Sequence, residues 1–136
     1  MLGRPIGPEK EMGAMTKELI LVVDDAVDST EMLTQGLEID GYAAARICRP
    51  VHGSWLDAIY DVLAHTHVDL ILLDTQLIPR GYGPDLARTL HKTYPDLPIV
   101  LTSAGRVEEV PDLRSERVIV GFFKKPFDLT ELYRLI

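Results

Sequence analysis

The sequence has little cysteine, no long hydrophobic run and few basic residues, and each shortage excludes a class of protein. Cys48 is the only cysteine, which excludes an internal disulfide and is typical of a reducing compartment. No apolar run approaches the roughly 20 residues of a membrane span, and residues 1–17 lack the apolar core of a signal peptide. The sequence has 14 basic residues and 21 acidic residues. We therefore expect a cytoplasmic protein without membrane insertion or direct nucleic-acid binding.

The 136 residues suffice for one domain with a substantial core. Residues 1–17 are rich in glycine, proline and charge, which predicts a flexible tail, and residues 18–136 form the predicted domain. Apolar runs typical of strands are Leu19–Val23, Ala43–Ile47, Leu70–Leu73, Ile99–Thr102 and Val118–Phe123. Their alternation with helical segments predicts an α/β fold, with a five-stranded parallel sheet covered by helices on both faces.

Helical spacing of apolar residues predicts four helices, at Ser29–Asp40, Trp55–Ala64, Leu86–Tyr94 and Asp128–Ile136. The first is expected to have Asp28 or Ser29 as its N-cap and Met32, Leu33, Leu37 and Ile39 on one inward face. Asp128 is expected to cap the last helix. Pro111 and dense charge leave at most a short helix within 105–117, and the last helix is also short.

Acidic residues follow two of the predicted strands. Asp24 and Asp25 come directly after Leu19–Val23, and Asp74 comes directly after Leu70–Leu73. Asp74 either caps the turn that follows or takes part in chemistry, because a lone buried carboxylate is costly. Since ligands of parallel sheets bind at the carboxyl ends of the strands, all three carboxylates are expected to meet at one edge.

The same edge should receive a hydroxyl and an ammonium group. The fourth strand ends in Thr102-Ser103, and the fifth continues into Lys124-Lys125-Pro126. Three carboxylates about 4 Å apart repel one another by several kcal/mol, so a cation is expected among them. Carboxylates are the hard oxygen ligands that Mg²⁺ prefers. An aspartate beside Mg²⁺, a lysine and a hydroxyl can accept a phosphoryl group, which predicts Asp74 as the phosphoacceptor.

Four segments resemble the receiver domain of two-component response regulators and hybrid histidine kinases. They are ILVVDD (20–25), DLILLD (69–74), PIVLTSA (98–104) and FFKKPF (122–127), in the order and at the spacing of that family. The resemblance covers residues 18–136. It implies the flavodoxin-like strand order 2-1-3-4-5, and a module that promotes its own phosphotransfer and dephosphorylation without being an enzyme.

The resemblance also implies a role for individual residues. Asp74 would take phosphate from a histidine kinase or histidine phosphotransfer protein. Asp24 and Asp25 would bind Mg²⁺ with Asp74, Asp25 being the expected direct ligand, and the main-chain carbonyl of Gln76 would complete the site. Lys125 would contact the phosphoryl group and precede a cis peptide bond to Pro126. The resemblance also implies a conformational switch, in which the Ser103 hydroxyl turns toward the phosphoryl group and the Phe122 ring moves inward with it.

The sequence departs from the family pattern in three places. The loop TQLIPRGYG after Asp74 is one residue longer than is common, the region 105–117 is irregular, and the last helix is short. A phosphorylation-independent interaction module is therefore the alternative function. A haloacid-dehalogenase-type hydrolase fits less well, because it needs a second aspartate where Gln76 stands. The output, the cognate kinase and a possible homodimer stay open.

Overall fold

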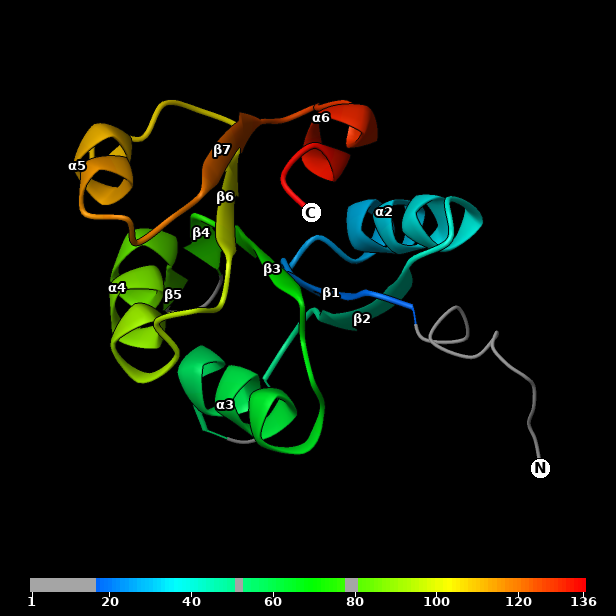
Figure 1. The fold of residues 1–136 in the computed structure, drawn as a ribbon, viewed down its shortest axis with the longest axis horizontal. Coiled ribbons are helices and arrows are strands. Elements are labelled where there is room, and N and C mark those ends of the chain that lie inside the picture. Colours follow the sequence, from blue (N-terminus) through cyan, green and yellow to red (C-terminus); the bar gives the residue numbers. More distant parts are fainter. Residues whose placement is uncertain (1–16, 51–52, 78–80) are drawn as a thin grey trace.

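The computed structural model describes residues 17–50, 53–77 and 81–136, and its centre is a five-stranded sheet (Figure 1). The strand order is β2-β1-β3-β6-β7, and each neighbouring pair is parallel. These strands are β1 (Leu19–Val23), β2 (Ala43–Ile47), β3 (Leu70–Asp74), β6 (Ile99–Ser103) and β7 (Gly121–Lys124). Counted among these five alone, the order is the predicted 2-1-3-4-5. The predicted tail lies outside the described residues except for Lys17.

Helices cover both faces of the sheet, as predicted (Figure 1). Those of the described residues are α2 (Val27–Ile39), α3 (Trp55–His65), α4 (Gly83–Thr93), α5 (Val110–Ser115) and α6 (Leu129–Tyr133). Helices α3, α4 and α5 contribute buried residues to one apolar cluster, and α2 and α6 contribute to the other. The sheet is therefore wound on both sides.

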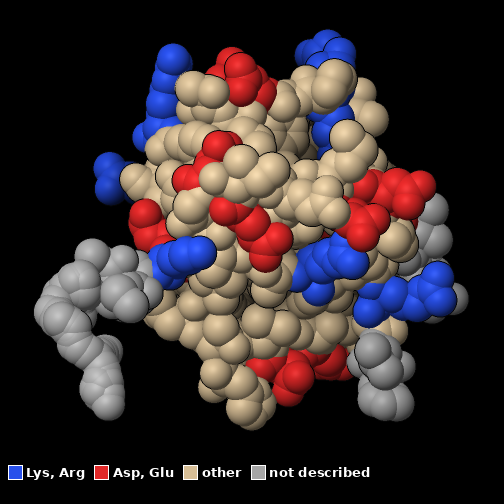
Figure 2. Space-filling model, turned by 90° about the vertical axis from the view of Figure 1, so that its right-hand side faces the viewer, with Lys and Arg blue, Asp and Glu red and all other residues tan. Residues whose placement is uncertain are grey.

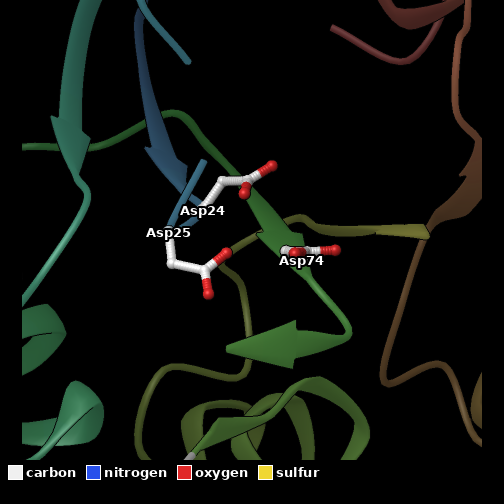
Figure 3. A group of neighbouring side chains, drawn as sticks. All are labelled: Asp24, Asp25 and Asp74. Carbon is white, nitrogen blue, oxygen red and sulfur yellow. The ribbon is translucent and has the colours of Figure 1, made fainter. Parts of the chain in front are cut away.

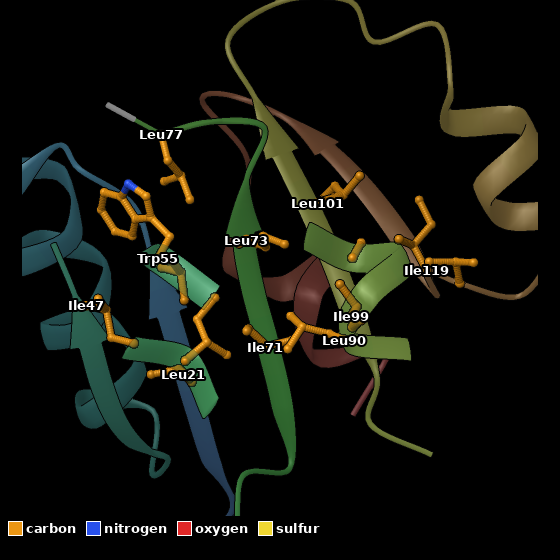
Figure 4. Packing of buried hydrophobic residues seen from close by; sticks show 14 of the residues in the cluster. Leu21, Ile47, Trp55, Ile71, Leu73, Leu77, Leu90, Ile99, Leu101 and Ile119 are labelled. Carbon is orange, nitrogen blue, oxygen red and sulfur yellow. The ribbon is translucent and has the colours of Figure 1, made fainter. Parts of the chain in front are cut away.

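Side chains of the central strands alternate between these two clusters. The cluster under α3, α4 and α5 includes Leu21, Ile71, Leu73, Ile99 and Leu101 (Figure 4). The cluster under α2 and α6 includes Ile20, Val22, Leu70, Leu72 and Val100. Because both faces of each strand are covered, the strands need no alternation of polar and apolar residues. This explains the unbroken aliphatic run before Asp74.

Helix α2 begins earlier than predicted and without the predicted cap. It starts at Val27, and its N-cap residue is Ala26, which makes no side-chain capping bond. Asp28 and Ser29 therefore do not cap the helix. Instead, Asp24 accepts a hydrogen bond from the Ala26 N–H through its Oδ1 atom at 3.0 Å. A carboxylate at the end of β1 thus satisfies an amide that precedes the first turn.

The predicted inward face of α2 is also partly wrong. Leu37 is buried, but the side chains of Met32 and Ile39 are 74% and 84% exposed. Thr30 and Thr34 are buried in their place, and their hydroxyls donate hydrogen bonds to carbonyls of the preceding turn. Because this local bonding satisfies the hydroxyls, threonine can occupy an inward position that apolar periodicity does not reveal.

The fifth apolar run divides into two parts rather than forming one strand. Strand β7 begins at Gly121, whereas Val118 and Ile119 are buried in the connection before it. Arg117 has a positive φ of 61°, and the Val118 N–H donates to the Leu113 carbonyl at 2.8 Å. The chain therefore turns after α5, and Val118 and Ile119 pack beneath this helix instead of extending the sheet.

A small hairpin after β3 was not predicted. Strands β4 (Gln76–Leu77) and β5 (Gly81–Tyr82) are antiparallel, and Leu77 is buried in the same cluster as Trp55. Two-residue strands are too short for a recognisable alternation of side chains. The hairpin occupies the loop that is one residue longer than the common pattern of the family.

The helix before β7 is short, as predicted, whereas the helix after it ends at Tyr133 rather than at the predicted Ile136. Helix α5 has six residues and α6 has five. Asp128 caps α6 by accepting a hydrogen bond from the Thr130 N–H at 2.9 Å. The Tyr133 hydroxyl donates to Asp40, which attaches α6 to the end of α2. The peptide bond between Lys125 and Pro126 is cis, as the resemblance implied.

The described surface carries charges of both signs. Figure 2 shows acidic and basic side chains interspersed on the face that it presents, without a continuous basic area among the described residues there. In the part of the chain that the structure describes, no helix is both long and apolar enough to cross a membrane.

Candidate functional site

Three carboxylates meet at the carboxyl end of the sheet. Asp24 and Asp25 follow β1, and Asp74 is the last residue of the neighbouring strand β3. One carboxylate oxygen from each lies within 4.8 Å of the others (Figure 3). Asp24 and Asp74 are buried, and Asp25 is partly exposed. The structure thus brings the three predicted acidic residues together.

Both carboxylate oxygens of Asp24 have protein partners. Oδ1 accepts the hydrogen bond from the Ala26 N–H, and Oδ2 lies 2.5 Å from the Lys125 Nζ atom. Asp24 is only 5% exposed, so its charge requires such compensation. Asp24 therefore supports the start of α2 and anchors the lysine as well as contributing to the acidic group.

Lys125 is held at the site by its own backbone. Its N–H donates to the Ser103 carbonyl at 2.7 Å, which continues the pairing of β6 with β7. Its Nζ atom is 3.6 Å from Asp74 Oδ1, farther than from Asp24. Burial lowers the pKa of Lys125, but the hydrogen bond and charge of Asp24, together with Asp74, outweigh burial and raise it. The side chain is therefore a cation at neutral pH.

Asp74 carries a strongly perturbed carboxyl group. Burial, and next the charge of Asp24, raise its pKa from 3.8 to about 6, although Lys125 and the hydrogen bond from the Thr75 N–H act in the opposite direction. That hydrogen bond joins Thr75 N to Asp74 Oδ1 at 2.9 Å. Burial is therefore the main cause of the raised pKa of Asp74, and the charge of Asp24 adds to it.

Ser103, unlike Thr102, lies at the pocket beside Asp74. Ser103 lines the same pocket as Asp74 and Lys125, whereas Thr102 does not. In the structure, Ser103 Oγ accepts a hydrogen bond from the Gly105 N–H at 3.1 Å. The role of Ser103 as the switch hydroxyl stays a prediction.

Phe122 and Gln76 are the two further residues to which the resemblance assigns a role. Phe122 is half-buried, pairs with Leu101 in the sheet, and packs against the cluster under α3, α4 and α5. Gln76 has an exposed side chain, lies in β4 and borders the pocket. The Mg²⁺ contact of its carbonyl and the switching of Phe122 stay predictions.

A pocket of about 560 Å³ adjoins Asp74, and the sequence analysis did not predict part of its lining. Tyr82 of the small hairpin borders it, as do Arg106 and Glu109 of the segment between β6 and α5. The Tyr82 hydroxyl donates a hydrogen bond to Glu109 Oε2 at 2.5 Å. The available sequence signals were the longer loop after Asp74 and the irregular region 105–117, where the family pattern is not followed.

The donor set at this edge fits a divalent cation. Three carboxylates and one ammonium group leave a local charge of −2, and the carboxylate oxygens converge within 4.8 Å. Hard oxygen donors at this spacing suit Mg²⁺. Asp74 also lines the adjoining pocket, together with Ser103 and Lys125.

Comparison with known proteins identifies the family. The sequence model of the response regulator receiver domain matches residues 20–136. The chain therefore belongs to this family, which supplies the receiver module of response regulators.

Curated relatives include larger regulators. The chain is 33% identical over 122 residues to the DNA-binding transcriptional regulator NtrC of Rhizobium meliloti, a match that covers 90% of this chain and 24% of the relative. It is also 33% identical over 119 residues to the response regulator MprA of Mycobacterium sp., covering 83% of this chain and 46% of the relative. The chain thus spans about a quarter to a half of these relatives.

Solved structures agree with the fold. The non-phosphorylated HemR receiver domain of Leptospira biflexa has a TM-score of 0.67 and 31% identity, covering 88% of this chain and 91% of that one. The response regulator TrrA of Thermotoga maritima, solved in complex with Mg²⁺-BeF, has a TM-score of 0.70 and 25% identity, covering 87% and 95%. Both are similar to this chain along nearly its whole described length.

Proposed function

We propose that this receiver domain, residues 18–136, accepts a phosphoryl group on Asp74 from a phosphohistidine of a histidine kinase or histidine phosphotransfer protein. The observation that carries the proposal is the position of Asp74. It ends the central strand β3, adjoins two further carboxylates, and shares a pocket with Ser103 and Lys125. A residue that merely capped a turn would not need these neighbouring carboxylate, hydroxyl and ammonium groups.

The chemistry begins with the Asp74 carboxylate as nucleophile. Its pKa of about 6 leaves it mostly ionised at neutral pH, and a bound cation would increase this fraction. A carboxylate oxygen forms a bond to phosphorus while the bond from phosphorus to the histidine nitrogen breaks, and the imidazole leaves as the second product. Lys125 is placed to offset negative charge on the phosphoryl oxygens.

Asp24, Asp25, Asp74 and the main-chain carbonyl of Gln76 are the residues that would hold Mg²⁺. Bound there, the ion would neutralise charge on the carboxylates and on the transferring phosphoryl group. Asp25 would be the direct ligand, as the family resemblance implies, and its carboxylate lies in the acidic group. The Mg²⁺-BeF complex of the similar TrrA protein supports the choice of metal.

The output of phosphorylation would be a change in the surface near β6 and β7. The Ser103 hydroxyl would turn toward the phosphoryl group, and Phe122 would move inward with it. Phosphate would thereby shift a two-state population rather than create a new fold. The domain would act as a cytoplasmic signalling module for a downstream partner, and would promote only its own phosphotransfer and dephosphorylation.

Intact-mass spectrometry with acetyl phosphate tests the proposal. The wild-type protein should gain one phosphoryl mass in the presence of Mg²⁺, and Asp74→Asn should gain none. Beryllofluoride, which imitates the phosphoryl group, should change the amide chemical shifts of the wild type alone. The absence of both responses in the wild type at saturating Mg²⁺ would instead support the phosphorylation-independent interaction module.

A further inference from the structure

A side-chain hydrogen bond connects the two segments that flank the pocket beside Asp74. The hydroxyl of Tyr82, in the hairpin after β3, donates to Glu109 Oε2 at 2.5 Å. Glu109 ends the segment 104–109 that leads from Ser103 to α5. Both residues line the pocket. This contact spans 27 positions of the chain and belongs to neither the acidic group nor the core.

The backbone of Tyr82 is fixed to that of the acceptor. Tyr82 pairs with Gln76 in the hairpin, and the following Gly83 N–H donates to the Thr75 carbonyl at 2.8 Å. A Cβ atom at Gly83 would lie 2.6 Å from the Asp74 carbonyl oxygen, so the two segments are in direct backbone contact. The backbone that carries the Tyr82 ring is therefore held against the backbone of Asp74.

The segment 104–109 is bonded at both of its ends. At its beginning, the Gly105 N–H donates to Ser103 Oγ at 3.1 Å. At its end, Glu109 receives the Tyr82 hydroxyl and its carbonyl accepts from the Leu113 N–H at 2.9 Å. The Tyr82 bond raises the pKa of the phenol to about 12, so the hydroxyl remains a donor across the physiological range.

We propose, on the basis of the function proposed above, that Tyr82 and Glu109 are positioning residues. They hold segment 104–109 in the arrangement in which Ser103 is bonded to Gly105, and this arrangement opposes phosphoryl binding at Asp74. If Ser103 turns its hydroxyl to donate to a phosphoryl group on Asp74, as proposed above, its Oγ atom moves away from the Gly105 N–H and that hydrogen bond is lost. The segment would then have to rearrange while Tyr82 remains fixed to the acceptor backbone. The Tyr82–Glu109 bond therefore biases the population toward the resting arrangement.

Three variants separate this hydrogen bond from the charge of Glu109. Tyr82→Phe removes only the donor, Glu109→Ala removes the acceptor and the charge, and Glu109→Gln keeps an acceptor oxygen without the charge. Beryllofluoride affinity at saturating Mg²⁺ is measured by amide chemical shifts. A net hydrogen-bond contribution predicts an affinity about three- to tenfold higher in Tyr82→Phe and in Glu109→Ala. Glu109→Gln should remain close to the wild type.

The double variant Tyr82→Phe/Glu109→Ala should gain no more than either single one, because both remove the same bond. In the ligand-free Tyr82→Phe protein, the Gly105 amide shift should move along the line from the free to the bound wild type. Equal gains in Glu109→Gln and Glu109→Ala, with none in Tyr82→Phe, would attribute the effect to charge and overturn the proposal.

Two further outcomes would also overturn it, and they differ from each other. If the wild type binds beryllofluoride and Tyr82→Phe binds it equally well, the positioning role is wrong while the phosphoacceptor function stands. If the wild type itself binds none, the proposed function fails and the positioning role fails with it.

Discussion

Replacing Asp74 with asparagine should stabilise the metal-free protein at neutral pH. Asp74 has a pKa of about 6 in the folded protein, compared with an ordinary value of 3.8. Between these values the unfolded chain ionises Asp74 while the folded protein retains its proton, so stability falls as the pH rises. Above both values the full penalty is present, and below both it is absent. Asparagine cannot ionise and escapes this penalty.

The magnitude follows from the difference of about 2 units, at about 1.4 kcal/mol per unit, which sets an upper limit of about 3 kcal/mol. The Asp74 carboxylate adjoins a solvent-filled pocket, and water screens part of the repulsion. We therefore expect a gain of about 1–2 kcal/mol in the free energy of unfolding, or about 4–8 °C in Tm. The hydrogen bond from the Thr75 N–H can persist, because asparagine also offers an Oδ1 acceptor.

Urea denaturation with a chelator checks this at two pH values. The variant should exceed the wild type near pH 7.5 and approach it near pH 3, where the Asp74 carboxyl is mostly protonated in both the folded and the unfolded state. Added Mg²⁺ should stabilise the wild type more than the variant, since the ion relieves the repulsion that asparagine has already removed. An Asp74→Asn protein that is less stable than the wild type near pH 7.5 would refute the reasoning.

Two further substitutions test the surroundings of Asp74. Lys125→Met should reduce the metal-free stability by about 2 kcal/mol, because it leaves the buried charge of Asp24 without its cation; urea denaturation measures this, and Lys124→Met at the exposed neighbour should cost almost nothing. Gly83→Ala should cost about 1–3 kcal/mol and slow phosphorylation by acetyl phosphate, because its Cβ would meet backbone atoms of Asp74 and Thr75. The control is Gly105→Ala, where no atom lies within 4 Å of the added Cβ, and equal losses in both would contradict the steric argument.

Much of the fold could be predicted because its signals are local. The strand Leu70–Asp74 is an unbroken aliphatic run, and the alternation of such runs with helical spacing leaves few topologies open. The predictions failed where local patterns compete with tertiary contacts. Thr30 is buried because its hydroxyl finds partners in its own helix and at Cys48, and Val118 is buried beneath α5 rather than in the sheet.

The acidic group could be predicted for a different reason. Parallel strands place their carboxyl ends at one edge, so Asp24, Asp25 and Asp74 had to converge once the strands were recognised. The Tyr82–Glu109 bond follows no such rule. It joins a two-residue strand to a loop, and neither segment has a periodicity that could show which side chains meet.

The same electrostatic arrangement links stability to activity in this domain. The folding energy of the core holds three carboxylates together against their repulsion, and Lys125 offsets only part of it. The metal-free domain is therefore less stable than its core would allow, and a cation that relieves the repulsion is bound more tightly as a result. A variant that stabilises the metal-free state by removing a carboxylate must lose cation affinity in return, because both effects come from the same charge. Stability and metal binding should consequently change in opposite directions when Asp74 is replaced.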